Sequence, residues 1–163
     1  MEFSINTVTL FLAIMLTGLA AGLCFTWTNA ITPGIGQLDN LGYLRSFQQM
    51  NRTILNPLFF IVFFGPFLMA LFAAILNKAT APQTFWMILI AGGVYFVGVA
   101  MVTIFGNVPL NEILDKTDLM ASNEQELKEL RKQFEGPWNR LHLIRTITSA
   151  ISFGLLILAG FTK

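Results

Sequence analysis

Charged side chains are scarce in this sequence: they make up 12% of the 163 residues, whereas hydrophobic residues make up 55%. A soluble domain normally spends about a quarter of its residues on Asp, Glu, Lys and Arg. With half that share, the chain has too little polar surface to cover a domain of its size in water. The composition therefore excludes an ordinary soluble domain and predicts an integral membrane protein.

Cysteine and histidine are scarcer still, because Cys24 and His142 are the only residues of these types. A single cysteine excludes an internal disulfide and any multi-cysteine metal or redox motif. A single imidazole argues against metal sites that need several imidazoles or thiolates. We therefore predict no cofactor. Two alternatives stay open: a haem with His142 as axial ligand, and an iron held by His142 with Glu112 and Asp115.

Strong charge of one sign is also missing. The net charge is +1 and no run of like charges stands alone, so we expect no nucleic acid partner. The sequence contains no Gly-rich nucleotide loop, P-loop or nucleophile elbow.

Four long stretches contain no charged residue: Phe3–Leu38, Thr53–Asn77, Ala79–Asn111 and Thr146–Thr162. A bilayer core about 30 Å thick needs roughly 20 apolar residues of helix to cross it. We predict a single all-α domain over residues 1–163, an integral membrane four-helix bundle with spans at about 6–29, 57–76, 85–105 and 143–162. The first stretch is too long for a signal-peptide core, so we expect it to be a permanent span.

Proline and glycine mark the predicted end of the first span and the start of the second. The segment Thr32-Pro33-Gly34-Ile35-Gly36 predicts a loop. Asn56 is predicted to cap the second span, with Pro57 in its first turn.

Between the third and fourth spans, residues 111–136 are predicted to form a polar loop that contains a short amphipathic surface helix. Gly106 and Pro109 would end the third span, and Asn111 stands where an N-cap belongs. Ser122-Asn123-Glu124-Gln125 resembles a capping box for the surface helix. Gly136-Pro137 would end that helix and open the fourth span.

Gly18 and Gly22 lie four residues apart in the first span. Small residues at this spacing let two helix backbones approach closely in lipid. We expect this face to contact another helix, and a homo-oligomer through Gly18 and Gly22 is one arrangement that it allows. The lipid bilayer itself is the other expected partner.

Four spans in up-and-down order bring alternate helix ends to the same membrane side. The polar residues gather on one of the two sides, and the other offers only Glu2, Lys78, Gln83 and Lys163. We predict a site on the polar side. Its candidate residues are Asn51, Arg52, Asn56, Asn107, Asn111, Trp138, His142 and Arg145.

Trp138, His142 and Arg145 follow at helical spacing and therefore share one stripe of the fourth helix. Ionisable groups at membrane depth usually face the protein interior, so we predict His142 and Arg145 to be catalytic. In the alternative interpretation, Trp138 belongs to an interfacial belt and Arg145 extends to the lipid headgroups.

The other candidates carry weaker signals. Asn107 has no evident capping task and is predicted to contact substrate. Asn56 and Asn111 suit a cap as well as a ligand contact. Arg52 either faces the pocket or touches lipid phosphates, and Asn51 is equally open.

The order of three motifs is similar to a known family. They are Met50-Asn51-Arg52 with Asn56-Pro57, then Phe105-Gly106-Asn107-Val108-Pro109-Leu110-Asn111, then Trp138-x-x-x-His142-x-x-Arg145. From about Thr17 to Ala159 the chain resembles the anthrone oxygenase-like family of small four-helix membrane proteins, largely described as a domain of unknown function. Fungal members work in aromatic polyketide pathways. The resemblance implies oxidation of an anthrone methylene to a quinone carbonyl by dioxygen.

An anthrone enolate can reduce dioxygen without metal or flavin, so such an enzyme needs a base, an oxyanion partner and an apolar pocket. His142 would be the base, because imidazole alone titrates near neutrality. Arg145 or Arg52 would stabilise the enolate oxygen, and Asn107 or Asn51 would donate a second hydrogen bond.

In this hypothesis the substrate is a small hydrophobic aromatic molecule that enters from the bilayer and stacks on Trp138. The alternative is a non-catalytic membrane protein that binds a lipid, a quinone or a partner subunit through the same pocket. Eight of the ten Lys and Arg residues lie on the polar side, which predicts that this side of the four-span protein faces the cytoplasm.

Overall fold

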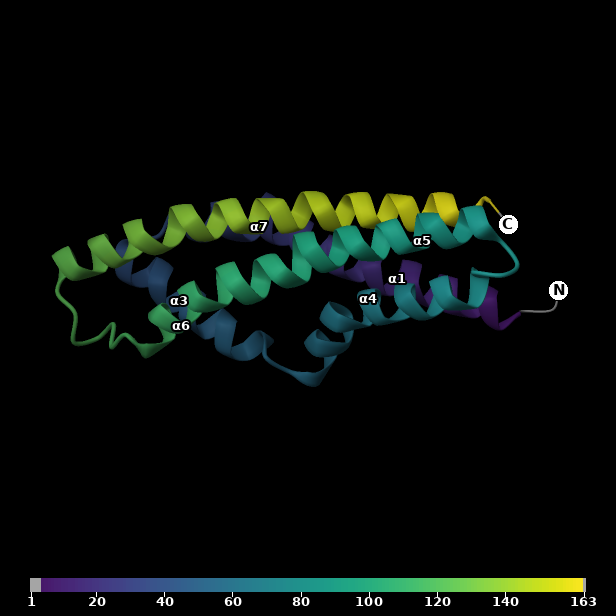
Figure 1. The fold of residues 1–163 in the computed structure, drawn as a ribbon. Coiled ribbons are helices and arrows are strands. Elements are labelled where there is room, and N and C mark those ends of the chain that lie inside the picture. The colour runs from purple at the N-terminus through teal and green to yellow at the C-terminus, as the bar shows by residue number, and fades with distance from the viewer. Residues whose placement is uncertain (1–3, 163) are drawn as a thin grey trace.

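The computed structural model describes residues 4–162, and within that range the chain consists of helices and turns (Figure 1). The all-α fold class predicted from the sequence is confirmed. Four continuous helices are long and apolar enough to cross a membrane: Ile5–Ile35, Pro57–Asn77, Pro82–Lys116 and Glu124–Gly160.

Regular and π-helical segments follow one another within these helices. The first comprises α1 (Ile5–Thr26), η1 (Trp27–Ile31) and α2 (Thr32–Ile35), where η denotes a π-helical turn. The second is α4 (Pro57–Asn77), which α3 (Asn40–Ile54) precedes. The third comprises α5 (Pro82–Tyr95), η2 (Phe96–Met101), η3 (Thr103–Asn107) and α6 (Val108–Lys116). The fourth is α7 (Glu124–Gly160).

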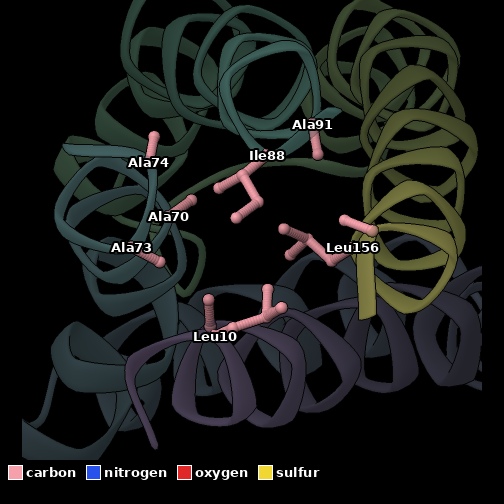
Figure 2. Packing of buried hydrophobic residues seen from close by; sticks show 9 residues of the cluster. Leu10, Ala70, Ala73, Ala74, Ile88, Ala91 and Leu156 are labelled. Carbon is pink, nitrogen blue, oxygen red and sulfur yellow. The ribbon is translucent and has the colours of Figure 1, made fainter. Parts of the chain in front are cut away.

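The four long helices surround a core of small side chains. α1 packs against α4 and α7, and α5 packs against the same two helices. Figure 2 shows the side chains that fill the space between them: Leu10, Ala13, Ala70, Ala73, Ala74, Ile88, Ala91, Leu156 and Ala159. Alanines let the backbones approach closely, and close packing is what holds helices together in lipid.

Large apolar side chains cover the outer faces of the same helices. Exposed examples are Phe11 in α1, Ile61 in α4, Ile90 in α5 and Ile151 in α7. Soluble monomers rarely expose apolar surface on every side. These faces suit the acyl chains of a bilayer.

The small-residue face of α1 makes its contact inside the chain. Gly18 lies against α7, because a Cβ on Gly18 would be 2.9 Å from the ring of Phe153. A Cβ on Gly22 would meet nothing within 4 Å. The expected contact of this face with another helix is therefore confirmed at Gly18, whereas a homo-oligomer stays a prediction.

The predicted loop at Thr32–Gly36 is wrong, because the first helix continues to Ile35. A proline inside an α-helix clashes with the carbonyl four residues earlier. The π-helical turn η1 relieves that clash ahead of Pro33. In it, the N–H of Thr32 donates to the carbonyl of Trp27, five residues back, and the Thr32 hydroxyl donates to the same oxygen at 3.1 Å.

The third helix does not end at Gly106 and Pro109 as predicted, because a π-helical turn again precedes the proline. The π-helical turn η3 precedes Pro109, and the N–H of Val108 donates to the carbonyl of Thr103. The helix therefore runs on to Lys116. Asn111 lies inside α6 and is not an N-cap, which corrects the capping interpretation.

The predicted surface helix is not separate from the fourth span. α7 runs unbroken from Glu124 to Gly160 and contains Pro137. Pro137 and Gln133, four residues earlier, are both exposed, so water can bond the carbonyl that loses its partner. Asn123 and Glu126 form the capping box, one residue later than predicted.

α7 is longer than a membrane requires. Its 37 residues span about 55 Å, against a hydrocarbon core of about 30 Å. Its N-terminal part lies beside α3 and α6, and its C-terminal part packs against α1 and α5 (Figure 1). We call α3, α6 and this N-terminal part the head. Its core includes Tyr43, Leu44, Phe47, Leu114 and Phe134.

Tyr43 lies in the interior of the head, with none of its surface exposed. Burial raises the pKa of its hydroxyl, and the neighbouring carboxylate of Glu135 raises it further. Arg131 lowers the same pKa, since its guanidinium carbon lies 4.4 Å from the centre of the tyrosine ring. The head is therefore a folded layer with its own core, and it covers one end of the bundle.

Candidate functional site

A pocket of about 300 Å³ lies where the membrane bundle meets the head. Side chains from α1, α3, α4, η3, α6 and α7 line it. Its volume is at the lower end of the range of roughly 300–1,000 Å³ that is typical of small-molecule sites. Every predicted site residue except Asn56 lines this pocket: Asn51, Arg52, Asn107, Asn111, Trp138, His142 and Arg145.

Asn56 acts as a cap. Its side-chain oxygen accepts a hydrogen bond from the backbone N–H of Phe59 at 3.0 Å, which fixes the first turn of α4. The capping interpretation of Asn56 is therefore confirmed.

His142 is buried at the wall of the pocket, with 3% of its surface exposed. Its Nε2 lies 3.0 Å from the carbonyl oxygen of Cys24 in α1. A carbonyl oxygen can only accept, so Nε2 carries the hydrogen. The other ring nitrogen, Nδ1, is buried and has no hydrogen-bond partner among residues 4–162. In the neutral ring, Nδ1 holds the lone pair of a base.

Trp138 fixes the plane of this imidazole. The two rings stack with their centroids 4.8 Å apart and an angle of 15° between their planes. The indole Nε1–H of Trp138 donates to Asn111 Oδ1 at 2.8 Å. Phe47 packs edge-on against the same indole, with the centroids 4.7 Å apart. Contacts from α6 and α3 thus position Trp138, and Trp138 in turn positions His142.

Arg145 enters the pocket one turn beyond His142. Its Nη1 donates to Asn107 Oδ1 over a long 3.4 Å, and its Nε is buried without a partner in the described part of the chain. The Asn107 side chain is 1% exposed, and its Nδ2 donates to the backbone carbonyl of Trp138 at 3.3 Å. Asn107 therefore ties η3 to α7 and also contacts the guanidinium.

Three residues that line this pocket each carry a buried polar atom without a partner within residues 4–162. Asn51 Nδ2 is a third one, buried and without an acceptor within residues 4–162. With His142 Nδ1 and Arg145 Nε, the pocket walls hold one unused acceptor and two unused donors. Buried polar groups are normally paired, so this arrangement indicates a site prepared for a polar ligand atom.

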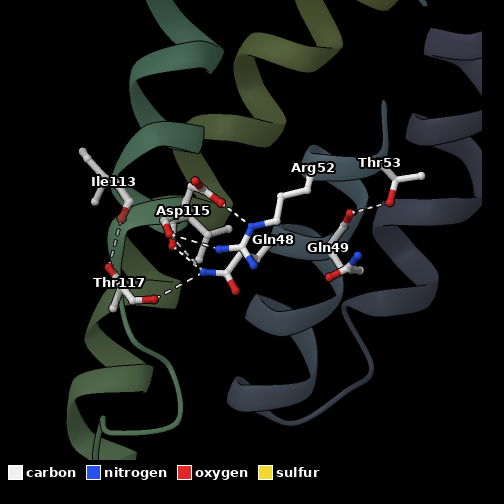
Figure 3. Close-up of polar contacts among 8 residues, drawn as sticks. Gln48, Gln49, Arg52, Thr53, Ile113, Asp115 and Thr117 are labelled. Atoms are coloured by element: carbon white, nitrogen blue, oxygen red, sulfur yellow. Dashed lines mark hydrogen bonds and ion pairs between the residues drawn. The ribbon is translucent and has the colours of Figure 1, made fainter. Parts of the chain in front are cut away.

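The guanidinium of Arg52 is already paired with a carboxylate. Its Nε contacts Asp115 Oδ1 at 2.6 Å, and both side chains are about half exposed, at 52% and 51%. Figure 3 shows this ion pair beside Gln48, whose Nε2 donates to the carbonyls of Leu114 at 2.9 Å and Thr117 at 3.3 Å. These bonds join α3 to the C-terminal end of α6. Of these residues, Arg52 and Asp115 line the pocket.

Part of the pocket lining is apolar. Leu23, Leu55 and Val108 line the pocket and are also exposed on the outer surface. Leu55 lies at the break between α3 and α4, where the helical wall is interrupted. The pocket lining therefore combines charged side chains of the head with these apolar side chains at the outer surface, which we call the apolar mouth.

Sequence reasoning missed several lining groups. The carbonyl of Cys24 belongs to the backbone, so the residue type at this position does not indicate that it contacts His142. Trp27 could have been found, because it lies three residues after Cys24 and so on the same face of the helix. Phe59 and Thr103 also line the pocket, and no signal of spacing marks them. Within residues 4–162, no group of three His, Cys, Asp or Glu side chains is placed to hold a metal ion.

Comparison with known proteins gives a family match over these elements. The sequence model of the anthrone oxygenase family matches residues 59–155, which is more than half of the chain. The matched region contains Asn107, Asn111, Trp138, His142 and Arg145. Comparison with curated proteins gave no match, and comparison with solved structures gave none either.

Proposed function

Because the chain belongs to the anthrone oxygenase family, we propose that it uses dioxygen to oxidise a flat, lipid-soluble aromatic substrate of the anthrone type. The observation that carries the proposal is His142, a buried imidazole whose Nδ1 lacks a partner within residues 4–162 and whose side chain lines the pocket. A general base must be able to reach the proton that it removes, and an unused ring nitrogen meets that need.

In the proposed reaction, His142 Nδ1 takes a proton from the methylene carbon of the substrate. Nε2–H stays bonded to the carbonyl of Cys24, so the imidazolium keeps its orientation. Arg145 stabilises the negative charge on the enolate oxygen, and Asn51 or Asn107 donates a second hydrogen bond. Arg52 is less suited to this role because its guanidinium pairs with Asp115.

Dioxygen then accepts electrons from the enolate, and a carbon–oxygen bond forms at the former methylene carbon. The imidazolium protonates the resulting peroxide. Removal of the second C–H proton breaks the O–O bond and leaves a carbonyl group, and the expelled hydroxide takes a proton to become water. One methylene and one dioxygen give one carbonyl and one water, so no external reductant is required.

The walls of the pocket support the remaining roles. Trp138 positions the base by stacking on it and adds aromatic surface for the substrate rings. Asn111 holds Trp138 through the indole N–H. The apolar mouth at Leu23, Leu55 and Val108 supports entry from the bilayer.

The test is oxygen consumption with an anthrone, by protein purified in mild detergent and corrected for spontaneous oxidation. His142→Gln keeps an amide N–H that can donate to the Cys24 carbonyl but provides no base. We expect the variant to be about 100-fold slower or worse, as for the loss of a general base. Arg140→Gln is the matched control, because Arg140 is exposed on the same helix and does not line the pocket.

Two outcomes would overturn parts of the proposal. A wild-type rate in His142→Gln would remove His142 as the base. A wild-type protein that binds the anthrone but adds nothing to its spontaneous oxidation would favour the alternative, a pocket that binds a lipid or quinone without chemistry.

A further inference from the structure

Arg145 has a positive charge that no carboxylate balances within residues 4–162. The ion pairs in this range are Arg52–Asp115, Lys116–Glu112 and Arg131–Glu135. The two acids that line the pocket, Glu112 and Asp115, therefore already have cationic partners. Within residues 4–162, the guanidinium of Arg145 makes one hydrogen bond, the long contact to the neutral amide of Asn107.

A guanidinium in a protein keeps its proton, so Arg145 cannot become neutral. The residue belongs to an apolar helix that is long enough to cross a membrane. A charge at such a place is costly unless an opposite charge or several hydrogen bonds accompany it. The described side chains around the pocket therefore leave the charge of Arg145 unbalanced.

Two residues on different helices of the pocket wall carry a hydrogen-bond donor without an acceptor. Arg145 Nε in α7 and Asn51 Nδ2 in α3 are both buried without acceptors in the described chain, and both side chains line the pocket. N–H donors beside a fixed positive charge are the surroundings that bind anions in proteins. Water reaches this region easily, since Arg52 and Asp115 line both this pocket and an outer polar cleft.

We propose that the pocket holds a monovalent anion of about the size of chloride, bound by Arg145 and Asn51, whenever no organic ligand is present. The anion supplies the missing negative charge in the resting state. It leaves when a ligand oxygen takes over the same donors.

The anion site rests on the unbalanced charge of Arg145 and on the unpartnered donors of Arg145 and Asn51, and not on the proposed function. One consequence rests on the proposed function: the anion occupies the position that the enolate oxygen would take. Chloride therefore raises the KM for the anthrone and leaves kcat unchanged.

Iodide quenching of tryptophan fluorescence tests the site without any turnover. The chain has 3 tryptophans. Trp27 and Trp138 line the pocket, whereas Trp86 is 59% exposed, so Trp86→Phe leaves only the pocket fluorophores. In this background we expect quenching that saturates with iodide and that chloride competes away. Gluconate replaces part of the halide so that the ionic strength stays constant.

Arg145→Gln in the same background is expected to weaken iodide binding by at least about tenfold, the value of one hydrogen bond to a charged group. Arg140→Gln is the matched control and should bind iodide as the parent does. Quenching that rises linearly with iodide and ignores chloride would overturn the proposal. So would saturable quenching that survives Arg145→Gln unchanged.

Should Arg145→Gln not fold, chloride competition in the Trp86→Phe protein decides the question, together with Arg145→Lys, which keeps the charge and should keep saturable quenching. The proposed function fails by a different measurement, the oxygen consumption of His142→Gln. A failure of one proposal is thus distinguishable from a failure of the other.

Discussion

Gly98 and Thr148 approach each other so closely that no side chain fits between them. A Cβ on Gly98 would lie 2.5 Å from the Cβ, Cγ2 and Oγ1 atoms of Thr148. This contact joins η2 to α7. Thr148 lies on the same helix as the two pocket residues, three residues after Arg145 and six after His142. The distance between the two helices beside the site therefore depends on a glycine.

Gly98→Ala should destabilise the protein by about 1–3 kcal/mol, the usual cost of overpacking a core. Gly93→Ala is the control, because a Cβ on Gly93 would meet nothing within 4 Å. Alanine is the better helix former, so the control should unfold at the wild-type temperature or slightly above it. Thermal unfolding in detergent measures both. Equal transition temperatures for the two variants would show that the contact is not tight.

The hydrogen bond of His142 predicts its tautomer. Nε2 should carry the hydrogen and Nδ1 should not, because Nε2 faces the carbonyl of Cys24. The chain has 1 histidine, so nitrogen NMR of histidine-labelled protein in detergent gives one imidazole and needs no assignment. Above neutral pH we expect one protonated and one unprotonated ring nitrogen, with Nε2 protonated. The opposite tautomer would leave the proposed base without its lone pair.

Trp138 and Asn111 should act as a unit. Trp138→Phe keeps an aromatic ring against His142 but loses the indole N–H, and Asn111→Ala removes its acceptor. Each single variant should lose about 1 kcal/mol of stability. The double variant should lose much less than the sum, because both changes delete the same hydrogen bond. Additive losses in thermal unfolding would show that this hydrogen bond does not couple the two residues.

The position of the site could be predicted because it depends on the order of the spans. Successive spans cross the membrane in opposite directions. Once four apolar stretches are assigned, this alternation alone puts Asn51, Asn107, His142 and Arg145 on one membrane side. The spacing of His142 and Arg145 on one helix then brings them to the same wall. None of these steps needs the details of packing, and the pocket lining includes all four residues.

The course of the helices around the site could not be predicted from local rules. Pro33 and Pro109 end a helix only if the helix stays α-helical, and in both places the chain widens into a π-helical turn instead. Tertiary packing selects that turn. Because η3 continues into α6, Asn111 reaches Trp138 and does not cap a helix. The sequence likewise does not indicate that the backbone carbonyl of Cys24 orients His142.

Gly22 offers a test of the predicted homo-oligomer. The Gly18 face is filled by Phe153 of the same chain, whereas the space beside Gly22 is open. If a second copy packs there, Gly22→Leu should shift the protein toward monomer in detergent without lowering its unfolding temperature. Gly18→Leu should lower the unfolding temperature in any case, because it collides with Phe153. Multi-angle light scattering measures the mass, and an unchanged mass in Gly22→Leu would argue against an oligomer through this face.

The orientation in the membrane is the last prediction. The head side carries eight of the ten Lys and Arg residues, so the head should face the cytoplasm. Cys24 is the only cysteine and is buried, so Cys24→Ala gives a background without thiols that keeps the backbone carbonyl bonded to His142. Lys78 and Lys128 are both exposed, at opposite ends of the protein.

In intact cells, an impermeant thiol reagent should label Lys78→Cys and spare Lys128→Cys. Permeabilised cells serve as the control, because both positions should then react. Labelling of Lys128→Cys from outside would reverse the orientation. The polar cleft and the charged wall at Arg52 and Asp115 would then open to the exterior, and the anion at Arg145 would come from that side.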